Sequence, residues 1–156
     1  MTTDQIGDEI AAGEALSRAD RGDEAIAHFR GLVERYPDEP RAHFALGGAF
    51  DSAGHAAAAV EPYRRAMALG LSGEDVARWY VQFGSTLRNV GQIDEAVSLL
   101  GEGRDRVPDD AAVRVFLALA LHTSGRSADG LAELIELLLL GSSAPALRRY
   151  ERSIRG

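Results

Sequence analysis

The sequence predicts an all-α protein, an α-α superhelix (solenoid) of four antiparallel helix hairpins followed by a C-terminal capping helix. Two observations lead to this prediction. The apolar residues follow the spacing of an α-helix, and small residues recur at nearly constant intervals of 34, 37 and 34 positions, at Gly13, Gly47, Gly84 and Ala118. Two antiparallel helices approach closely only where one presents a small side chain to a bulky one, so the series marks successive helix contacts.

Three further series keep the same register. Twelve residues after each small residue comes another, at Ala25, Ala59, Ala96 and Gly130. Four residues later comes a larger apolar side chain, at Phe29, Tyr63, Leu100 and Leu134. Glycines suited to the turn inside each hairpin stand at Gly54, Gly91 and Gly125. We therefore expect each unit to be a helical hairpin, in which Gly84 faces Leu100.

The hairpins are expected at residues 6–39, 40–73, 77–110 and 111–142, with the capping helix at 144–155, in a single domain spanning residues 1–156. In the first hairpin, Asp20 stands where the other units have a turn glycine. The longer interval comes from extra residues in the glycine-containing loop at residues 70–74. Pro62 lies inside an expected helix, where it removes one backbone hydrogen bond and should bend the helix.

This pattern resembles the tetratricopeptide repeat, whose period is about 34 residues and whose signature is an aromatic residue followed by Leu-Gly, Tyr, Ala, Phe and Pro. The second unit matches at His43, Leu46, Gly47, Phe50, Ala59, Tyr63 and Ala66. The third unit matches at Tyr80, Phe83, Gly84, Leu87, Ala96, Leu100 and Pro108. The resemblance covers nearly the whole chain. It implies that the first helices of successive hairpins line a concave groove, where partners bind, or that partners bind on the loops.

The side chains left on the first helices after the core positions are removed define the expected groove face. The predicted partner-binding residues are Arg41, Phe44, Asp51, Arg78, Gln82, Arg88, Asn89 and Leu119. This face changes from polar and arginine-bearing in the second and third units to apolar in the fourth. It suits an extended or helical peptide with an acidic part and an apolar anchor. The alternative is that the arginines form an ordinary solvated face.

An apolar run from Leu134 to Leu140, interrupted by Glu136, ends the fourth unit and is far shorter than the roughly 20 residues that a membrane span needs. The capping helix, with Leu147 and Tyr150 on its apolar stripe, would cover this surface. Alternatively a second copy of the chain covers it, through Leu138 and Leu139, and the protein is a homodimer.

The composition argues against several classes of partner. With 17 basic and 24 acidic residues, the formal net charge is −7, so the chain lacks the positive field that nucleic acid or an anionic membrane surface attracts. Without cysteine, no disulfide or thiolate metal site can form. The N-terminal residues lack the pattern of a signal peptide, so a cytoplasmic location is expected.

We find no arrangement of residues suited to catalysis or to metal binding. The four histidines are scattered and no pair has the i, i+4 spacing of a helical metal site; they are His28, His43, His55 and His122. The carboxylate pairs at residues 38–39 and 109–110 are expected to cap helices, and Trp79 and Tyr80 to pack in the core. We therefore predict a non-catalytic adaptor or scaffold without cofactor or metal, which binds a protein or peptide in its groove. The alternative is a self-assembling structural protein that dimerises through its apolar C-terminal surface.

Overall fold

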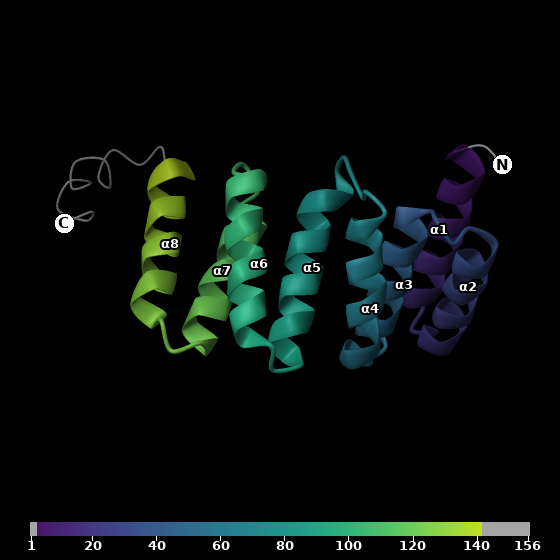
Figure 1. Ribbon diagram of the computed structural model, residues 1–156, viewed down its shortest axis with the longest axis horizontal. Helices are drawn as coiled ribbons and strands as arrows, with labels where there is room; N and C mark the ends of the chain where they lie inside the picture. Colours follow the sequence, from purple (N-terminus) through teal and green to yellow (C-terminus); the bar gives the residue numbers. More distant parts are fainter. Residues whose placement is uncertain (1–2, 142–156) are drawn as a thin grey trace.

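The computed structural model describes residues 3–141, and the expected capping helix at 144–155 lies outside the described residues. Residues 3–141 form eight helices, which are α1 (Thr3–Arg18), α2 (Gly22–Arg35), α3 (Pro40–Ser52), α4 (Ala56–Ala68), α5 (Asp75–Asn89), α6 (Ile93–Arg106), α7 (Ala111–Thr123) and α8 (Ser127–Gly141). The helices of each consecutive pair contact one another, and each first helix also contacts the first helix of the next pair. Figure 1 shows the pairs in a row, from α1 and α2 at one end to α8 at the other. The predicted all-α superhelix of hairpins is confirmed.

Glycines bring the two helices of a hairpin into close contact, as the sequence predicts. A Cβ atom added at Gly84 would lie 2.6 Å from Cγ of Leu100, and one added at Gly47 would lie 2.7 Å from the ring of Tyr63. These separations are shorter than carbon atoms tolerate, so no larger residue fits either position without moving its neighbour. The expected contact between Gly84 and Leu100 is therefore confirmed.

The turns inside the hairpins need a left-handed backbone conformation. Gly54, Gly91 and Gly125 adopt φ angles of +81°, +83° and +85°, which glycine reaches without steric cost. In the first hairpin Asp20 takes this role with φ of +59°, a conformation for which Asp is one of the more tolerant residues. The helix α4 continues through Pro62 from Ala56 to Ala68.

The junction between the second and third hairpins is built around aromatic side chains. The loop between α4 and α5 places Leu71 in the core, with 4% of its surface exposed. Trp79 donates a hydrogen bond from Nε1 to the carbonyl oxygen of Tyr63, at 2.7 Å. The rings of Trp79 and Tyr63 also lie 5.4 and 5.6 Å from that of Phe83. The expected structural role of Trp79 is therefore confirmed.

Acidic side chains begin two of the first helices. The Asp110 carboxylate accepts a hydrogen bond from the Val113 amide at 3.0 Å, and the Glu39 carboxylate accepts one from the Arg41 amide at 3.2 Å. Both residues therefore act as the helix caps that the sequence predicts. In the part of the chain that the structure describes, every helix is too short or too polar to cross a membrane.

Candidate functional site

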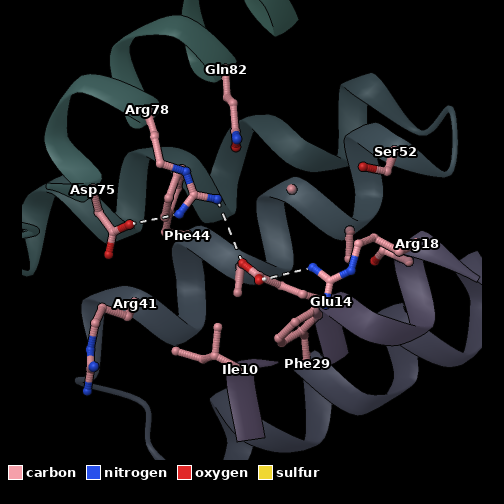
Figure 2. A pocket seen from close by; sticks show the side chains of 14 residues that line it. Ile10, Glu14, Arg18, Phe29, Arg41, Phe44, Ser52, Asp75, Arg78 and Gln82 are labelled. Atoms are coloured by element: carbon pink, nitrogen blue, oxygen red, sulfur yellow. Dashed lines mark hydrogen bonds and ion pairs between the residues drawn. The ribbon is translucent and has the colours of Figure 1, made fainter. Parts of the chain in front are cut away.

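A cavity of about 250 Å³ lies between the first helices α1, α3 and α5 (Figure 2). We call this cavity, with the exposed surface of these three helices around it, the first-helix groove. The apolar part of its lining consists of Ile10, Phe29, Phe44, Ala45 and Ala49. The charged part consists of Glu14, Arg18, Arg41, Asp75 and Arg78. The cavity thus combines an apolar interior with charged side chains at its margin.

Arg78 lies at the centre of the charged margin. One guanidinium nitrogen is 3.1 Å from Oδ1 of Asp75, and another is 3.7 Å from Oε1 of Glu14. The guanidinium also lies 5.4 Å from the ring centroid of Phe44, within the range of a cation–π contact. Figure 2 shows Arg78 extended over the cavity from α5 toward Glu14 on α1. The side chain therefore joins three first helices.

The other two arginines of the cavity are also paired. Arg18 lies 3.6 Å from the second oxygen of Glu14, and Arg41 lies 2.8 Å from Oε1 of Glu39. The three guanidiniums that line the cavity are thus already matched by carboxylates of the chain itself. An acidic peptide would have to displace these carboxylates in order to bind the same arginines.

A group of polar side chains joins α3 and α4 to α5 beside the cavity. Tyr63 donates a hydrogen bond from its hydroxyl group to Oε1 of Gln82, at 3.2 Å. The Thr86 hydroxyl lies 3.0 Å from Oδ2 of Asp51 and 2.9 Å from the carbonyl oxygen of Gln82. It has one proton, so it donates to one of these acceptors at a time.

The environment disfavours charge on both ionisable members of this group. Burial raises the pKa of the Asp51 carboxyl, and the hydrogen bond from Thr86 only partly opposes this effect. Burial also raises the pKa of the Tyr63 hydroxyl, and the negative charge of Asp51 raises it further. Tyr63 therefore stays a neutral hydrogen-bond donor at physiological pH.

The structure brings together four of the predicted partner-binding residues at the cavity, namely Arg41, Phe44, Arg78 and Gln82. The other four do not line the cavity. Asp51 lies on α3 directly before Ser52, which does line it. Arg88 and Asn89 are in the last turn of α5, and Leu119 on α7 is 40% exposed.

Sequence reasoning did not place every residue that lines the cavity, and Asp75 and Phe29 are two of those it missed. Asp75 fell outside the expected third hairpin, because α5 begins two residues before the predicted start at residue 77. Had the helix start been placed correctly, the i, i+3 spacing of Asp75 and Arg78 would have indicated their ion pair. Phe29 lies on α2, the second helix of its hairpin, whereas the groove was expected to be lined by first helices, so the sequence pattern placed it in the core; it is 1% exposed.

Two of the four histidines lie within hydrogen-bond distance of backbone carbonyl oxygens. Nε2 of His28 lies 2.7 Å from the carbonyl oxygen of Glu9, and Nε2 of His43 lies 2.8 Å from that of Pro37. Within residues 3–141, no three histidine or carboxylate side chains lie together as metal ligands would.

Helix α8 carries exposed leucines. The exposed fractions are 58% for Leu131, 41% for Leu134, 55% for Leu138 and 69% for Leu140. Leu139, predicted as an interface residue together with Leu138, is only partly exposed. The other two residues predicted for this surface, Leu147 and Tyr150, lie outside the described residues.

The inner face of α8 is held to α7 by a buried arginine. Arg114 on α7 is 7% exposed, and its guanidinium lies 3.0 Å from Glu133 and 3.1 Å from Glu136. These ion pairs fix which side of α8 faces the solenoid. The exposed leucines are consequently presented on the end of the described array.

Comparisons with solved structures find the same fold in other proteins. A structure of MamA has a TM-score of 0.73 at 19% identity, covering 85% of this chain and 71% of that one. YrrB, described as a TPR protein with an unusual peptide-binding site, has a TM-score of 0.71 at 16% identity, with coverages of 85% and 67%. PilF of Pseudomonas aeruginosa has a TM-score of 0.74 at 21% identity, with coverages of 96% and 70%.

At the level of sequence, no curated protein matches the chain. A family model does match. It is described as "Tetratrico peptide repeat" and covers residues 40–156, which is most of the sequence. Together with the eight helices of residues 3–141 and the close glycine contacts inside their hairpins, this match establishes that the chain belongs to the tetratricopeptide repeat family.

Proposed function

We propose that the protein is a non-catalytic adaptor that binds a peptide segment of another protein in the first-helix groove, with an apolar side chain of that segment in the cavity. Membership of the tetratricopeptide repeat family supports a protein-interaction module in general terms. The observation that carries the finer proposal is the cavity between α1, α3 and α5, with its apolar interior and charged margin.

The size of the cavity favours a side chain over a small-molecule ligand. Its volume of about 250 Å³ is below the roughly 300–1,000 Å³ typical of cofactor and substrate sites. The deep lining residues Phe29 and Phe44 are apolar and almost fully buried. An aliphatic or aromatic side chain in the cavity would contact this apolar lining, exclude water and leave the backbone of the peptide at the polar margin.

Gly48 offers a way to block the cavity without disturbing the fold. This residue lines the cavity from the interior of α3, and a Cβ atom there would lie 3.7 Å from Oε1 of Gln82, an ordinary contact. Gly48→Leu should therefore fill the cavity while raising the helix propensity of α3. Gly31→Leu is the matched control, since Gly31 lies inside α2, away from the cavity, and its Cβ would also meet only an ordinary contact, at 3.5 Å from Arg35.

The test begins with peptides selected from a random library on the wild-type protein, whose affinities are then measured by fluorescence anisotropy. We expect Gly48→Leu to weaken binding roughly tenfold or more, because burying one large aliphatic side chain contributes about 1.5–3 kcal/mol. Gly31→Leu should bind like the wild type. Equal affinities for all three proteins would refute binding in this cavity.

A second candidate function is self-assembly through α8, favoured by its four exposed leucines. An apolar surface of this kind at the end of a repeat array needs a cover, from residues 144–155 or from a second copy. If a second copy supplies the cover, light scattering should give a dimer mass for the wild type and a monomer mass for Leu138→Arg. A monomeric wild-type protein would rule out this candidate.

A further inference from the structure

The three arginines that line the cavity do not present an unbalanced positive charge. Arg78 is paired with Asp75 and Glu14, Arg18 shares Glu14, and Arg41 is paired with Glu39. Every ion pair in this set lies between side chains that are partly exposed at the margin of the cavity. A carboxylate from a partner would therefore meet arginines whose charge is already neutralised nearby.

The Asp51 carboxylate, in contrast to these arginines, has no ion-pair partner within residues 3–141. This half-buried carboxylate lies near the cavity without lining it. Asp51 follows the lining residue Gly48 by about one helical turn on α3, and the Thr86 hydroxyl lies within hydrogen-bond distance of both the Asp51 carboxylate and the backbone carbonyl oxygen of Gln82, another lining residue. Within residues 3–141 the side-chain contact of Asp51 is the hydrogen bond with Thr86, and no arginine or histidine forms an ion pair with it. One carboxylate oxygen thus remains open to a further donor.

The end of α3 adds a second source of uncompensated negative charge. The C-terminal end of a helix carries a partial negative charge, which a basic side chain in the last turn usually offsets. Arg18 does this in α1, Arg88 in α5, and His122 occupies the same turn of α7. The last turn of α3 holds no basic residue, and Asp51 lies in it.

Arg88 is not placed to neutralise Asp51. It follows Thr86 by two residues on α5, which corresponds to a rotation of about 200° around the helix axis. Thr86 faces Asp51, so Arg88 lies on a different side of α5. Within residues 3–141 no basic side chain forms an ion pair with Asp51, which leaves this carboxylate available to a basic group of a partner.

We infer that Asp51 binds a cationic group of the partner, a lysine ammonium or an arginine guanidinium, located next to the apolar side chain that occupies the cavity. This inference rests on the proposed function and names the charge of the segment that the groove accepts. The partner segment is thus expected to carry a cationic group, whereas the sequence alone suggested a peptide with an acidic part. The net charge of −7 supports it, because an acidic protein attracts cationic segments at long range.

Three short peptides test the inference directly: acetyl-Leu-Arg-amide, acetyl-Leu-Gln-amide and acetyl-Leu-Glu-amide. Their dissociation constants are measured from amide chemical-shift changes of the ¹⁵N-labelled full chain, with the Thr86 amide as the local reporter. We expect the Leu-Arg peptide to bind about fivefold more tightly than the Leu-Gln peptide, the gain of a favourable ion pair that is not fully buried. The Leu-Glu peptide should bind most weakly.

Two variants assign the preference to Asp51. Asp51→Asn keeps an oxygen that accepts the Thr86 hydrogen bond and removes the charge, so the Leu-Arg peptide should bind no better than the Leu-Gln peptide, whose affinity stays the same. Asp51→Arg should reverse the preference in favour of the Leu-Glu peptide. Asp109→Asn is the matched control, because it removes the same charge from an exposed loop residue and should keep the preference for arginine.

The outcomes separate this inference from the proposed function. If the Leu-Arg and Leu-Gln peptides bind equally and Gly48→Leu abolishes both, the cavity binds the leucine but the role of Asp51 is refuted. If Asp51→Asn keeps the arginine preference, or if the Leu-Glu peptide binds best to the wild type, the inference is likewise overturned. If arginine is preferred through Asp51 but Gly48→Leu has no effect, the apolar anchor of the proposed function fails instead. If no peptide shifts the amide signals around the groove, both are refuted.

Discussion

The substitution Gly84→Ala measures how much the close helix contacts contribute to the stability of the array. The added Cβ atom would lie 2.6, 2.7 and 2.8 Å from Cγ, Cδ1 and Cδ2 of Leu100, which is 1% exposed and enclosed by the core. Overpacking of this kind costs about 1–3 kcal/mol. Replacing glycine by alanine inside a helix gains about 0.8–1.0 kcal/mol. The expected net effect is a loss of about 1 kcal/mol in the free energy of unfolding.

The control is Gly101→Ala in α6, where a Cβ atom would have nothing within 4 Å. Urea denaturation followed by circular dichroism should show a higher midpoint for Gly101→Ala and a lower one for Gly84→Ala. In a Leu100→Ala background the obstructing side chain is gone, so Gly84→Ala should become stabilising. If Gly84→Ala stabilises the wild-type protein as much as Gly101→Ala does, the close contact is not what determines the identity of residue 84.

Two further predictions concern residues with unfavourable native surroundings. Asp20→Gly should raise the free energy of unfolding, measured by urea denaturation, by up to about 1 kcal/mol, because glycine adopts the φ of +59° at this turn without steric cost. A lower free energy of unfolding would show instead that the Asp20 side chain stabilises the turn. Asp51→Asn should stabilise the protein at pH 7 by roughly 0.5 kcal/mol, the magnitude of an unfavourable charge at a helix end. The native pKa of Asp51 is raised by burial, so its ionisation costs stability as the pH rises above its unfolded value of about 3.9. The advantage of Asp51→Asn in urea melts should therefore vanish below that pH, and an advantage that persists in acid would contradict this origin.

Much of the fold could be predicted because steric requirements act at fixed positions along the chain. The contact of Gly84 with Leu100 requires a residue without a side chain. Gly13 and Gly47 meet the same requirement in the first two hairpins, and the small residue Ala118 takes this position in the fourth, so a periodic series remains in the sequence. The turn glycines are similar, since Gly91 and Gly125 share a left-handed φ that few residues accept. Asp20 broke the glycine pattern yet occupies the same conformation, so the prediction of a turn there was correct although its usual residue was missing.

The groove could be predicted only in part, because the pairing of side chains depends on contacts between distant helices. The spacing of Arg41, Phe44, Arg78 and Gln82 was enough to bring them to one cavity. It gave no indication that Glu14, from the first hairpin, lies between two arginines. Counting arginines on one face therefore suggested an acidic partner, whereas the ion pairs of the folded chain remove most of that positive charge.

Asp51 allows a structural role and a binding role to be separated by experiment. If the carboxylate served to hold α3 against α5 through Thr86, Asp51→Asn would weaken the fold or leave it unchanged, with no specific effect on cationic peptides. If the carboxylate serves to bind a cation, the free protein carries a half-buried negative charge at the C-terminal end of α3, where the helix dipole is also negative. A bound cation would offset this repulsion and so stabilise the protein. The same substitution should then raise stability and abolish the preference for arginine. A gain in the free energy of unfolding together with a loss of the preference for arginine would indicate a charge that destabilises the free protein and stabilises the complex.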